Sequence, residues 1–316
     1  MAASVCLLLA IALLCAGLEL ACRELIMPAS RILGGNIAEW QAAVRVRRAS
    51  AQRHTALFVG NSLLDAGVDF PQLRSAVALA DPGWQAQRLM IEGTYYFDWY
   101  YGLRRLLAEG ARPDVIVLVL SPEQLNSNNY RDSLFAPIML QAGDLRSLSR
   151  AAALHPTVST GLLLGHYSWS YGFRGEWRKN LLRLAIPDFG DLARLFIPKV
   201  AANSQSANAD PHLDLRLEDL RKLTADAGIR LVMLLPPLAY ARPLEAQTTR
   251  AVRHAGIPLL VPVDSGGLSP EMYIDGVHLA PEGRRRFMQQ MVPAVTAELR
   301  QGPGQPQPTA ASRSGN

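Results

Sequence analysis

Short apolar runs alternate with amphipathic helical segments along most of the chain. Residues 55–59, 114–120 and 230–235 are rich in aliphatic side chains and stop at Gly, Ser-Pro or Pro-Pro, as strands buried on both faces do. Two weaker runs, 88–91 and 259–263, complete the set. Segments with helical spacing lie between them, at 95–109, 215–227, 244–254 and 281–300. This alternation predicts an α/β fold, a three-layer doubly wound sandwich with about five mostly parallel strands.

The chain opens on an apolar run, residues 2–18, at the short end of what spans a bilayer at about 1.5 Å per residue. Two interpretations remain open, a retained signal anchor and a cleaved signal peptide, and the lack of a clear A-x-A site favours the anchor. Both carry the rest of the chain across the membrane. The positive-inside rule opposes this, because five arginines follow the run closely: Arg23, Arg31, Arg45, Arg47 and Arg48.

The segment 126–210 breaks the alternation of strands and helices. It contains Trp169, Trp177 and several tyrosines, with helical or irregular patterning and no clear strand. We expect a helical insertion that caps the carboxyl edge of the sheet, where ligands of such folds bind. The predicted organisation is a signal anchor or transmembrane helix at 1–23, a stalk or linker helix at 24–53, an α/β domain at 54–300 and a disordered tail at 301–316.

Composition excludes several classes of function. The net charge of +5 rests almost wholly on arginine, with three lysines among 32 basic residues, which indicates genomic base composition more than a nucleic-acid surface. All the cysteines, Cys6, Cys15 and Cys22, lie near the N-terminus, so the remaining chain has no disulfide and no thiolate metal site. No lipobox, metal, nucleotide or cofactor motif is present. We therefore expect no cofactor and no nucleic-acid partner.

Two polar blocks carry the candidate chemistry. Gly60-Asn61-Ser62 lies where the first strand delivers a hydroxyl to the start of a helix, which suits either a nucleophile or a simple helix cap. Near the C-terminus, Asp275 and His278 are three residues apart, just before the final helix. In that spacing the carboxylate can hold one ring nitrogen while the other faces a nucleophile, which is the division of labour in a serine triad.

These two blocks resemble those of the SGNH/GDSL hydrolase family, in which an early Gly-Asp/Asn-Ser block supplies the nucleophile and a late Asp-x-x-His block supplies acid and base. The likeness spans residues 55–298 and is strong at both ends. The resemblance implies Ser62, Asp275 and His278 as catalytic residues, with the backbone N–H groups of Ser62 and Gly93 in the oxyanion hole. The alternative for Gly93 is a plain turn glycine.

The third block departs from the family pattern. In place of Gly-x-Asn-Asp the chain has Ser121-Pro122 followed by Asn126, which resembles membrane-anchored relatives such as D-alanine-transfer and polysaccharide O-acetyl-transfer proteins. By this resemblance Asn126 is a candidate for the remaining oxyanion donor.

The resemblance implies a serine esterase or O-acyltransferase that works through an acyl-serine intermediate. Its expected substrates are acylated carbohydrates or small esters, in the setting of cell-envelope or exported polysaccharide. The expected location is membrane-anchored, with the catalytic domain extracytoplasmic, and a membrane acyl-transfer partner is compatible with it. Two alternatives remain: a non-catalytic SGNH-like assembly component of a polysaccharide-modification machine, and a simple carboxylesterase or lipase.

Overall fold

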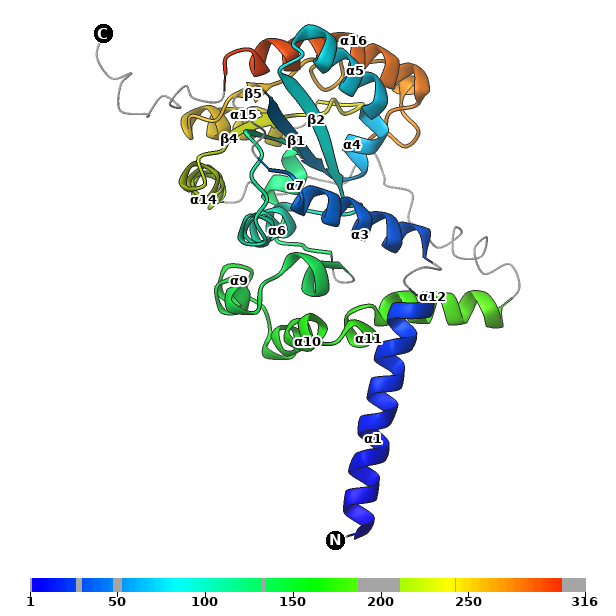
Figure 1. Cartoon of the computed structure of the whole chain (residues 1–316). Coiled ribbons are helices and arrows are strands. Elements are labelled where there is room, and N and C mark those ends of the chain that lie inside the picture. The colour runs from blue at the N-terminus through cyan, green and yellow to red at the C-terminus, as the bar shows by residue number, and fades with distance from the viewer. Residues whose placement is uncertain are drawn as a thin grey trace. The chain divides into compact units, whose positions relative to one another are not determined.

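The computed structural model describes residues 2–26, 30–47, 53–131, 134–186, 211–241 and 243–302. Its centre is a five-stranded, entirely parallel sheet with strand order β2-β1-β3-β4-β5 (Figure 1). The strands are β1 (His54–Gly60), β2 (Trp84–Met90), β3 (Val115–Val119), β4 (Arg230–Leu234) and β5 (Leu259–Leu260). The predicted architecture is confirmed, and all five expected runs are neighbouring strands of one sheet.

Helices cover both faces of the sheet, as the doubly wound prediction requires. Side chains of α4 (Ser62–Gly67), α5 (Phe70–Ala80) and α16 (Pro281–Leu299) share one apolar cluster with alternate residues of β1, β3 and β4, among them Phe58, Val117 and Val232. Successive strand residues point to opposite faces, so Leu57, Ile116 and their neighbours face the other layer. That layer holds α6 (Tyr96–Ala108), α14 (Leu213–Asp226) and α15 (Pro243–His254) (Figure 1).

The two weaker runs differ from their predicted bounds. β2 begins at Trp84, four residues before the predicted start, because its buried Trp84, Ala86 and Leu89 are separated by polar residues. This half-buried pattern is typical of an edge strand and lacks a continuous apolar run. β5 is only two residues long, whereas 259–263 was expected, since Pro262 cannot donate to a strand ladder.

The exposed edge of β2 is covered by a side chain from α3 (Arg31–Val44). Glu39 accepts a hydrogen bond from the Met90 backbone N–H at 2.6 Å and pairs with Arg88 at 2.5 Å. Arg88 also pairs with Asp65, on α4, at 2.9 Å. Charged side chains of this kind stop an edge strand from pairing with another chain.

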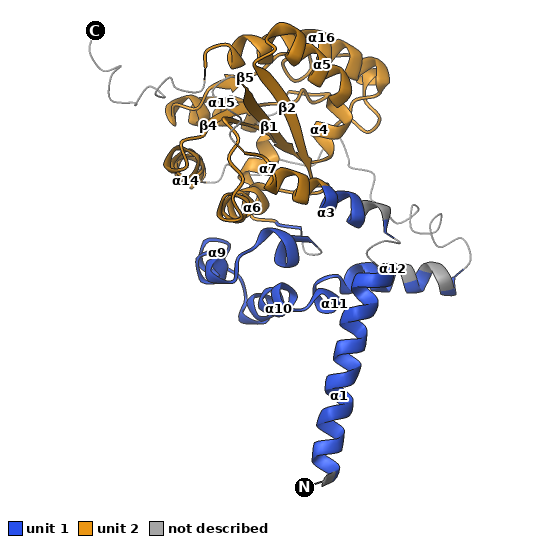
Figure 2. Cartoon of the chain, in the orientation of Figure 1, with its two compact units in different colours: residues 1–38, 130–198 blue, residues 39–129, 199–316 orange. Residues whose placement is uncertain are grey.

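The chain forms two compact units, one made of residues 1–38 and 130–198 and the other of 39–129 and 199–316 (Figure 2). The first, unit 1, is helical in all its described elements: α1 (Ala2–Ala21), η1 (Cys22–Ile26), η2 (Phe135–Met139), η3 (Ala142–Asp144), α9 (Leu145–Ala151), α10 (Pro156–Tyr167), α11 (Trp169–Gly172) and α12 (Arg174–Ala185). The second, unit 2, contains the sheet, α7 (Pro122–Asn126) and a short η4 (Pro270–Met272). Residues 187–210 and the tail from 303 lie outside the described part.

Candidate active site

Ser62 is the first residue of α4, directly after β1 reaches the carboxyl edge of the sheet. The capping role that Ser62 could have filled belongs to Asn61, whose Oδ1 accepts from the Leu63 N–H at 3.0 Å. Asn is among the best N-cap residues, so this assignment follows from local propensity. The Ser62 hydroxyl therefore does not cap the helix.

Two hydrogen bonds tie this turn to the turn after β2. The Asn61 side-chain amide donates to the Thr94 carbonyl at 2.9 Å, and the Ile91 N–H donates to the Gly60 carbonyl at 3.0 Å. Gly60 is required where β1 and β3 end together, because a Cβ there would lie 2.8 Å from the Val119 carbonyl oxygen. The nucleophile turn and the turn that contains Gly93 thus form one rigid assembly at the sheet edge.

The second block is a short closed loop between η4 and α16. Tyr273 and Leu279 form an antiparallel bridge at its base, and the Ile274 N–H donates to the His278 carbonyl at 2.8 Å. The loop is fixed to the residues after β4 by the Ala239 N–H, which donates to the Gly276 carbonyl at 3.1 Å. This loop returns Asp275 and His278 to the edge where β1 ends.

The structure brings Ser62, His278 and Asp275 into one hydrogen-bonded row. His278 Nε2 lies 2.8 Å from Ser62 Oγ, and His278 Nδ1 lies 2.7 Å from Asp275 Oδ2. Because the Asp275 carboxylate accepts, Nδ1 carries the proton and Nε2 is the acceptor for the Ser62 hydroxyl. Both distances are within the range expected of a nucleophile, its base and the group that orients the base.

Asp275 has a separate partner for each carboxylate oxygen. Oδ2 holds the imidazole, while Oδ1 accepts from the backbone N–H of Val277 at 3.0 Å and of His278 at 2.8 Å. Desolvation opposes ionisation of Asp275, but the hydrogen bonds from His278 and Val277 outweigh it and lower the pKa of this carboxyl. Asp275 therefore stays ionised in neutral solution, with its negative charge next to the imidazole of His278.

The row of side chains is open to solvent. The side chains of Asp275 and His278 are 43% and 32% exposed, and Ser62 is half-buried. Within the described residues no three His, Cys, Asp or Glu side chains are grouped as metal ligands would be.

The three oxyanion candidates have different surroundings. Ser62 begins α4, and Gly93 has a φ of 66° in the turn that Asn61 tethers to the nucleophile. Asn126, at the end of α7, is engaged elsewhere: its side-chain nitrogen donates to the Pro122 carbonyl at 2.7 Å and to Thr248 Oγ1 at 3.3 Å. These two contacts fix the loop after β3, and the oxyanion role of Asn126 stays a prediction.

Sequence reasoning did not identify Arg216, which organises the same loop. Its guanidinium is buried and donates to the carbonyls of Leu125 and Ser127, both at 3.1 Å, and to the Asn128 side chain. It also packs against the ring of Tyr96, 4.9 Å from the centroid. From sequence alone, an arginine on a helix is expected to be a solvated surface charge. No local sequence pattern indicates that its partners are in the distant loop after β3.

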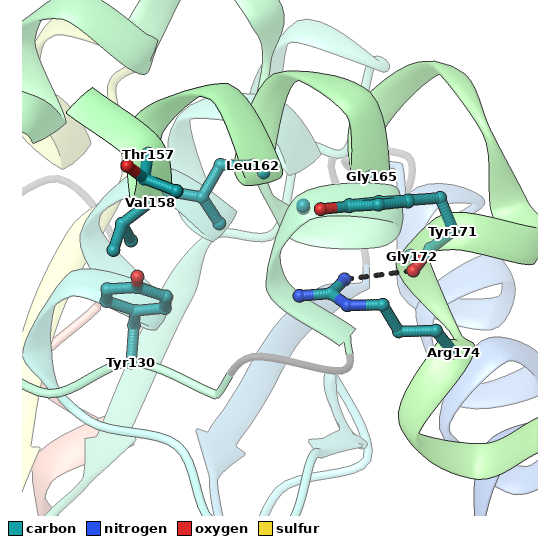
Figure 3. A pocket seen from close by; sticks show the side chains of 10 residues that line it. Tyr130, Thr157, Val158, Leu162, Gly165, Tyr171, Gly172 and Arg174 are labelled. Carbon is teal, nitrogen blue, oxygen red and sulfur yellow. Dashed lines mark hydrogen bonds between the residues drawn. The ribbon is translucent and has the colours of Figure 1, made fainter. Parts of the chain in front are cut away.

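A separate hollow of about 440 Å³ lies in unit 1, and no triad residue lines it. Its lining is mostly apolar or small, from α10 and from Ala136, and Arg174 is the one charged residue in it. Figure 3 shows the Arg174 guanidinium beside the Tyr171 ring, 4.3 Å from its centroid, with a hydrogen bond to the Tyr171 carbonyl at 2.9 Å. Unit 1 thus has a cavity of its own, apart from the triad.

No family model and no curated protein matches this chain. Among solved structures it is similar to TesA, with 15% identity and a TM-score of 0.39 over 77% of this chain and 98% of that one. It is also similar to a GDSL-like lipase from Bacteroides thetaiotaomicron, with 12% identity, a TM-score of 0.40 and coverage of 83% and 97%. A third similar structure is a catalytic mutant of the acetylxylan esterase Axe2 from Geobacillus stearothermophilus. Its identity is 12% and its TM-score 0.40, and the match covers 80% of this chain and 95% of that one. These likenesses are distant, and the chemistry of the site follows from its own geometry.

Proposed function

We propose that this chain is a serine esterase or O-acyltransferase of the SGNH type, with Ser62 as nucleophile, His278 as general base and Asp275 as the residue that orients the base. The observation that supports this most is the continuous hydrogen-bonded row from Ser62 Oγ through both ring nitrogens to Asp275. Neither a helix cap nor a structural histidine requires this bond, which joins residues 216 positions apart in the chain.

The proposed reaction proceeds in two halves. Ser62 Oγ attacks the ester carbonyl carbon and loses its proton to His278 Nε2, while the carbonyl oxygen gains the negative charge and is held by backbone N–H groups. The carbon–oxygen bond to the leaving alcohol then breaks, and His278 gives that alcohol its proton. Water or a sugar hydroxyl next attacks the acyl-Ser62 carbonyl and passes its own proton to His278. The bond between the acyl carbon and Ser62 Oγ then breaks, His278 returns the proton to Oγ, and the free acid or the new ester leaves.

Hydrolysis and transfer differ only in the second acceptor, so the triad serves both. We propose an acylated carbohydrate or small ester as substrate, in a membrane-anchored enzyme with its site outside the cytoplasm, acting on cell-envelope or exported polysaccharide. The support for this setting is the apolar helix of residues 3–25, which is long enough to cross a bilayer, together with the Ser121-Pro122 block. A membrane acyl-transfer partner is compatible with this setting.

The test is activity-based labelling of the purified full chain with a fluorophosphonate, which reacts only with an activated serine. Wild type is expected to label, Ser62→Ala is expected not to label, and Ser147→Ala, at an exposed serine of α9, serves as the matched control. Labelling of Ser62→Ala at the wild-type level would refute the assignment. Failure of the wild type to label would favour the non-catalytic assembly role.

A further inference from the structure

The carboxyl end of α1 is built into the helical packing of unit 1. Glu19 Oε1 accepts from the Trp169 N–H at 2.8 Å, and Oε2 accepts from the Ser170 N–H and the Ser168 hydroxyl, both at 3.0 Å. These groups form the start of α11, whose first N–H groups have no partner within the helix itself. One carboxylate of α1 therefore completes the hydrogen bonding of a helix that lies about 150 residues later in the chain.

Two further contacts join this end of α1 to the same place. The Arg23 guanidinium lies over the Trp169 ring, 5.1 Å from its centroid, and pairs with Glu19 at 3.6 Å. Cys22, on the turn between them, is fully buried. A cleaved signal peptide would take Glu19 with it and leave the start of α11 without its partner. The contacts fit a segment that stays attached.

Unit 1 also exposes apolar side chains away from α1. Ten large hydrophobic residues after η1 are exposed in the described part of the chain, and six of them fall between positions 158 and 186: Val158, Leu163, Leu164, Tyr167, Leu181 and Ile186. Three of these, Leu163, Leu164 and Tyr167, share one face of α10. α10 has no Asp, Glu, Lys or Arg at any position, although much of its surface is exposed. The solvent face of a surface helix ordinarily carries charged or polar residues.

In contrast to the uncharged α10, the later helix α12 is rich in basic residues. α12 bears exposed Arg174, Arg178 and Lys179, and its only acid is Glu176, which pairs with Lys179 at 2.8 Å. The aromatic residues Trp169 and Tyr171, on α11, stand between α10 and α12 in the chain, and Tyr167 ends α10. Apolar, aromatic and cationic side chains in this succession are what the surface of an anionic bilayer binds.

We propose that α1 remains as a membrane span and that α10 and α12 rest on the surface of the same bilayer, with Leu163, Leu164 and Tyr167 among the lipid chains and the α12 cations at anionic headgroups. Figure 2 shows α10, α11 and α12 gathered at the carboxyl end of α1, within unit 1. The occupant is lipid because this face continues from the end of the span: Glu19 is bonded to α11, the element directly after α10. This proposal does not depend on the chemistry of the triad.

The experiment uses the full chain in lipid nanodiscs that contain anionic lipid, with a spin label on Leu164→Cys or Tyr167→Cys. Cys6 and Cys15 are replaced by Ser, and the parent without an added cysteine gives the labelling background. Arg146→Cys, on an exposed position of α9 in the same unit, is the matched control. Both test labels are expected to show a severalfold higher ratio of oxygen to nickel-chelate relaxation than the control label. The intact mass of membrane-extracted protein is expected to include residues 1–22.

Each other result would overturn the proposal. A low ratio at both test positions, equal to that at the control, would mean that the α10 face lies in water. Labels shielded from both reagents would mean that a second copy or another protein covers this face. A mature mass lacking the first 22 residues would mean that the span is a leader. A ratio unchanged in purely zwitterionic lipid would remove the role given to the α12 cations. As a check against misfolding, the labelled variants and the parent should have the same thermal unfolding midpoint.

Discussion

Asn61→Ala is expected to weaken both the fold and the catalysis, because Asn61 is fully buried and serves two turns at once. The substitution removes the N-cap of α4, which costs about 1 kcal/mol, and deprives the buried Thr94 carbonyl of its donor, which costs a further 1–3 kcal/mol or so. We therefore expect the free energy of unfolding to fall by about 2–4 kcal/mol. Loss of the link between the Ser62 and Gly93 turns should also lower kcat by roughly tenfold to a hundredfold.

Asn61→Ser separates the two contributions, since a serine can still cap α4 but is too short to reach the Thr94 carbonyl. It should recover about 1 kcal/mol of stability while kcat stays low. Urea unfolding of the full chain in detergent and ester hydrolysis by the same samples provide the measurements, with Asn129→Ala as an exposed control. If Asn61→Ala unfolded at the wild-type midpoint with wild-type kcat, the coupling of the two turns would be wrong.

Five further outcomes follow from the structure. Ser62→Ala and His278→Ala should each remove nearly all ester turnover, and the double variant should be little worse, because the two groups act as a unit; additive losses in the rates would contradict this. Asp275→Asn should reduce kcat less than Ser62→Ala. Folding lowers the pKa of Asp275, so its contribution to stability is present above the unfolded pKa of about 4 and is lost as pH falls through the lower folded value. The urea midpoints of wild type and Asp275→Asn should therefore converge in acid. A constant difference between them would refute the pKa assignment. Gly283→Ala should destabilise the chain by more than about 1 kcal/mol in urea, because the new Cβ would clash with the Met272 carbonyl oxygen; an unchanged midpoint would contradict this. Arg216→Met should leave carbonyls of the 125–128 loop unpaired and raise hydrogen exchange there, whereas Arg221→Met, on the same helix, should not.

The sheet could be predicted because its central strands are apolar on both faces. Residues Val115–Val119 and Arg230–Leu234 read as continuous aliphatic runs, and each ends at residues that stop a strand. The edge strands could not be bounded, since β2 alternates polar and apolar positions and β5 is cut short by Pro262. The bounds of an edge strand depend on the strand it pairs with, and the pattern of apolar and polar residues within the edge strand does not contain that information.

The site was predictable where the chemistry depends on residues close in sequence. Asp275 and His278 meet at i and i+3 in a closed loop, and Ser62 sits at a strand end that the pattern locates. Asn126 shows the limit, because its partner Thr248 lies 122 residues away on another helix, and only the folded chain reveals this contact. The role of Arg216 could not be predicted for the same reason, because its partners in the loop lie about 90 residues away in the chain.

The central claim is that Ser62 carries the acyl group, and peptide mass mapping of the trapped intermediate tests it most directly. The full chain is mixed with p-nitrophenyl acetate, quenched in acid during turnover, digested and mapped. An acetyl group on Ser62 is expected in wild type, with no adduct in Ser62→Ala and a much slower rise of the adduct in His278→Ala. Turnover of Ser62→Ala at the wild-type rate, or an acetyl group at another residue that persists in Ser62→Ala, would contradict the account.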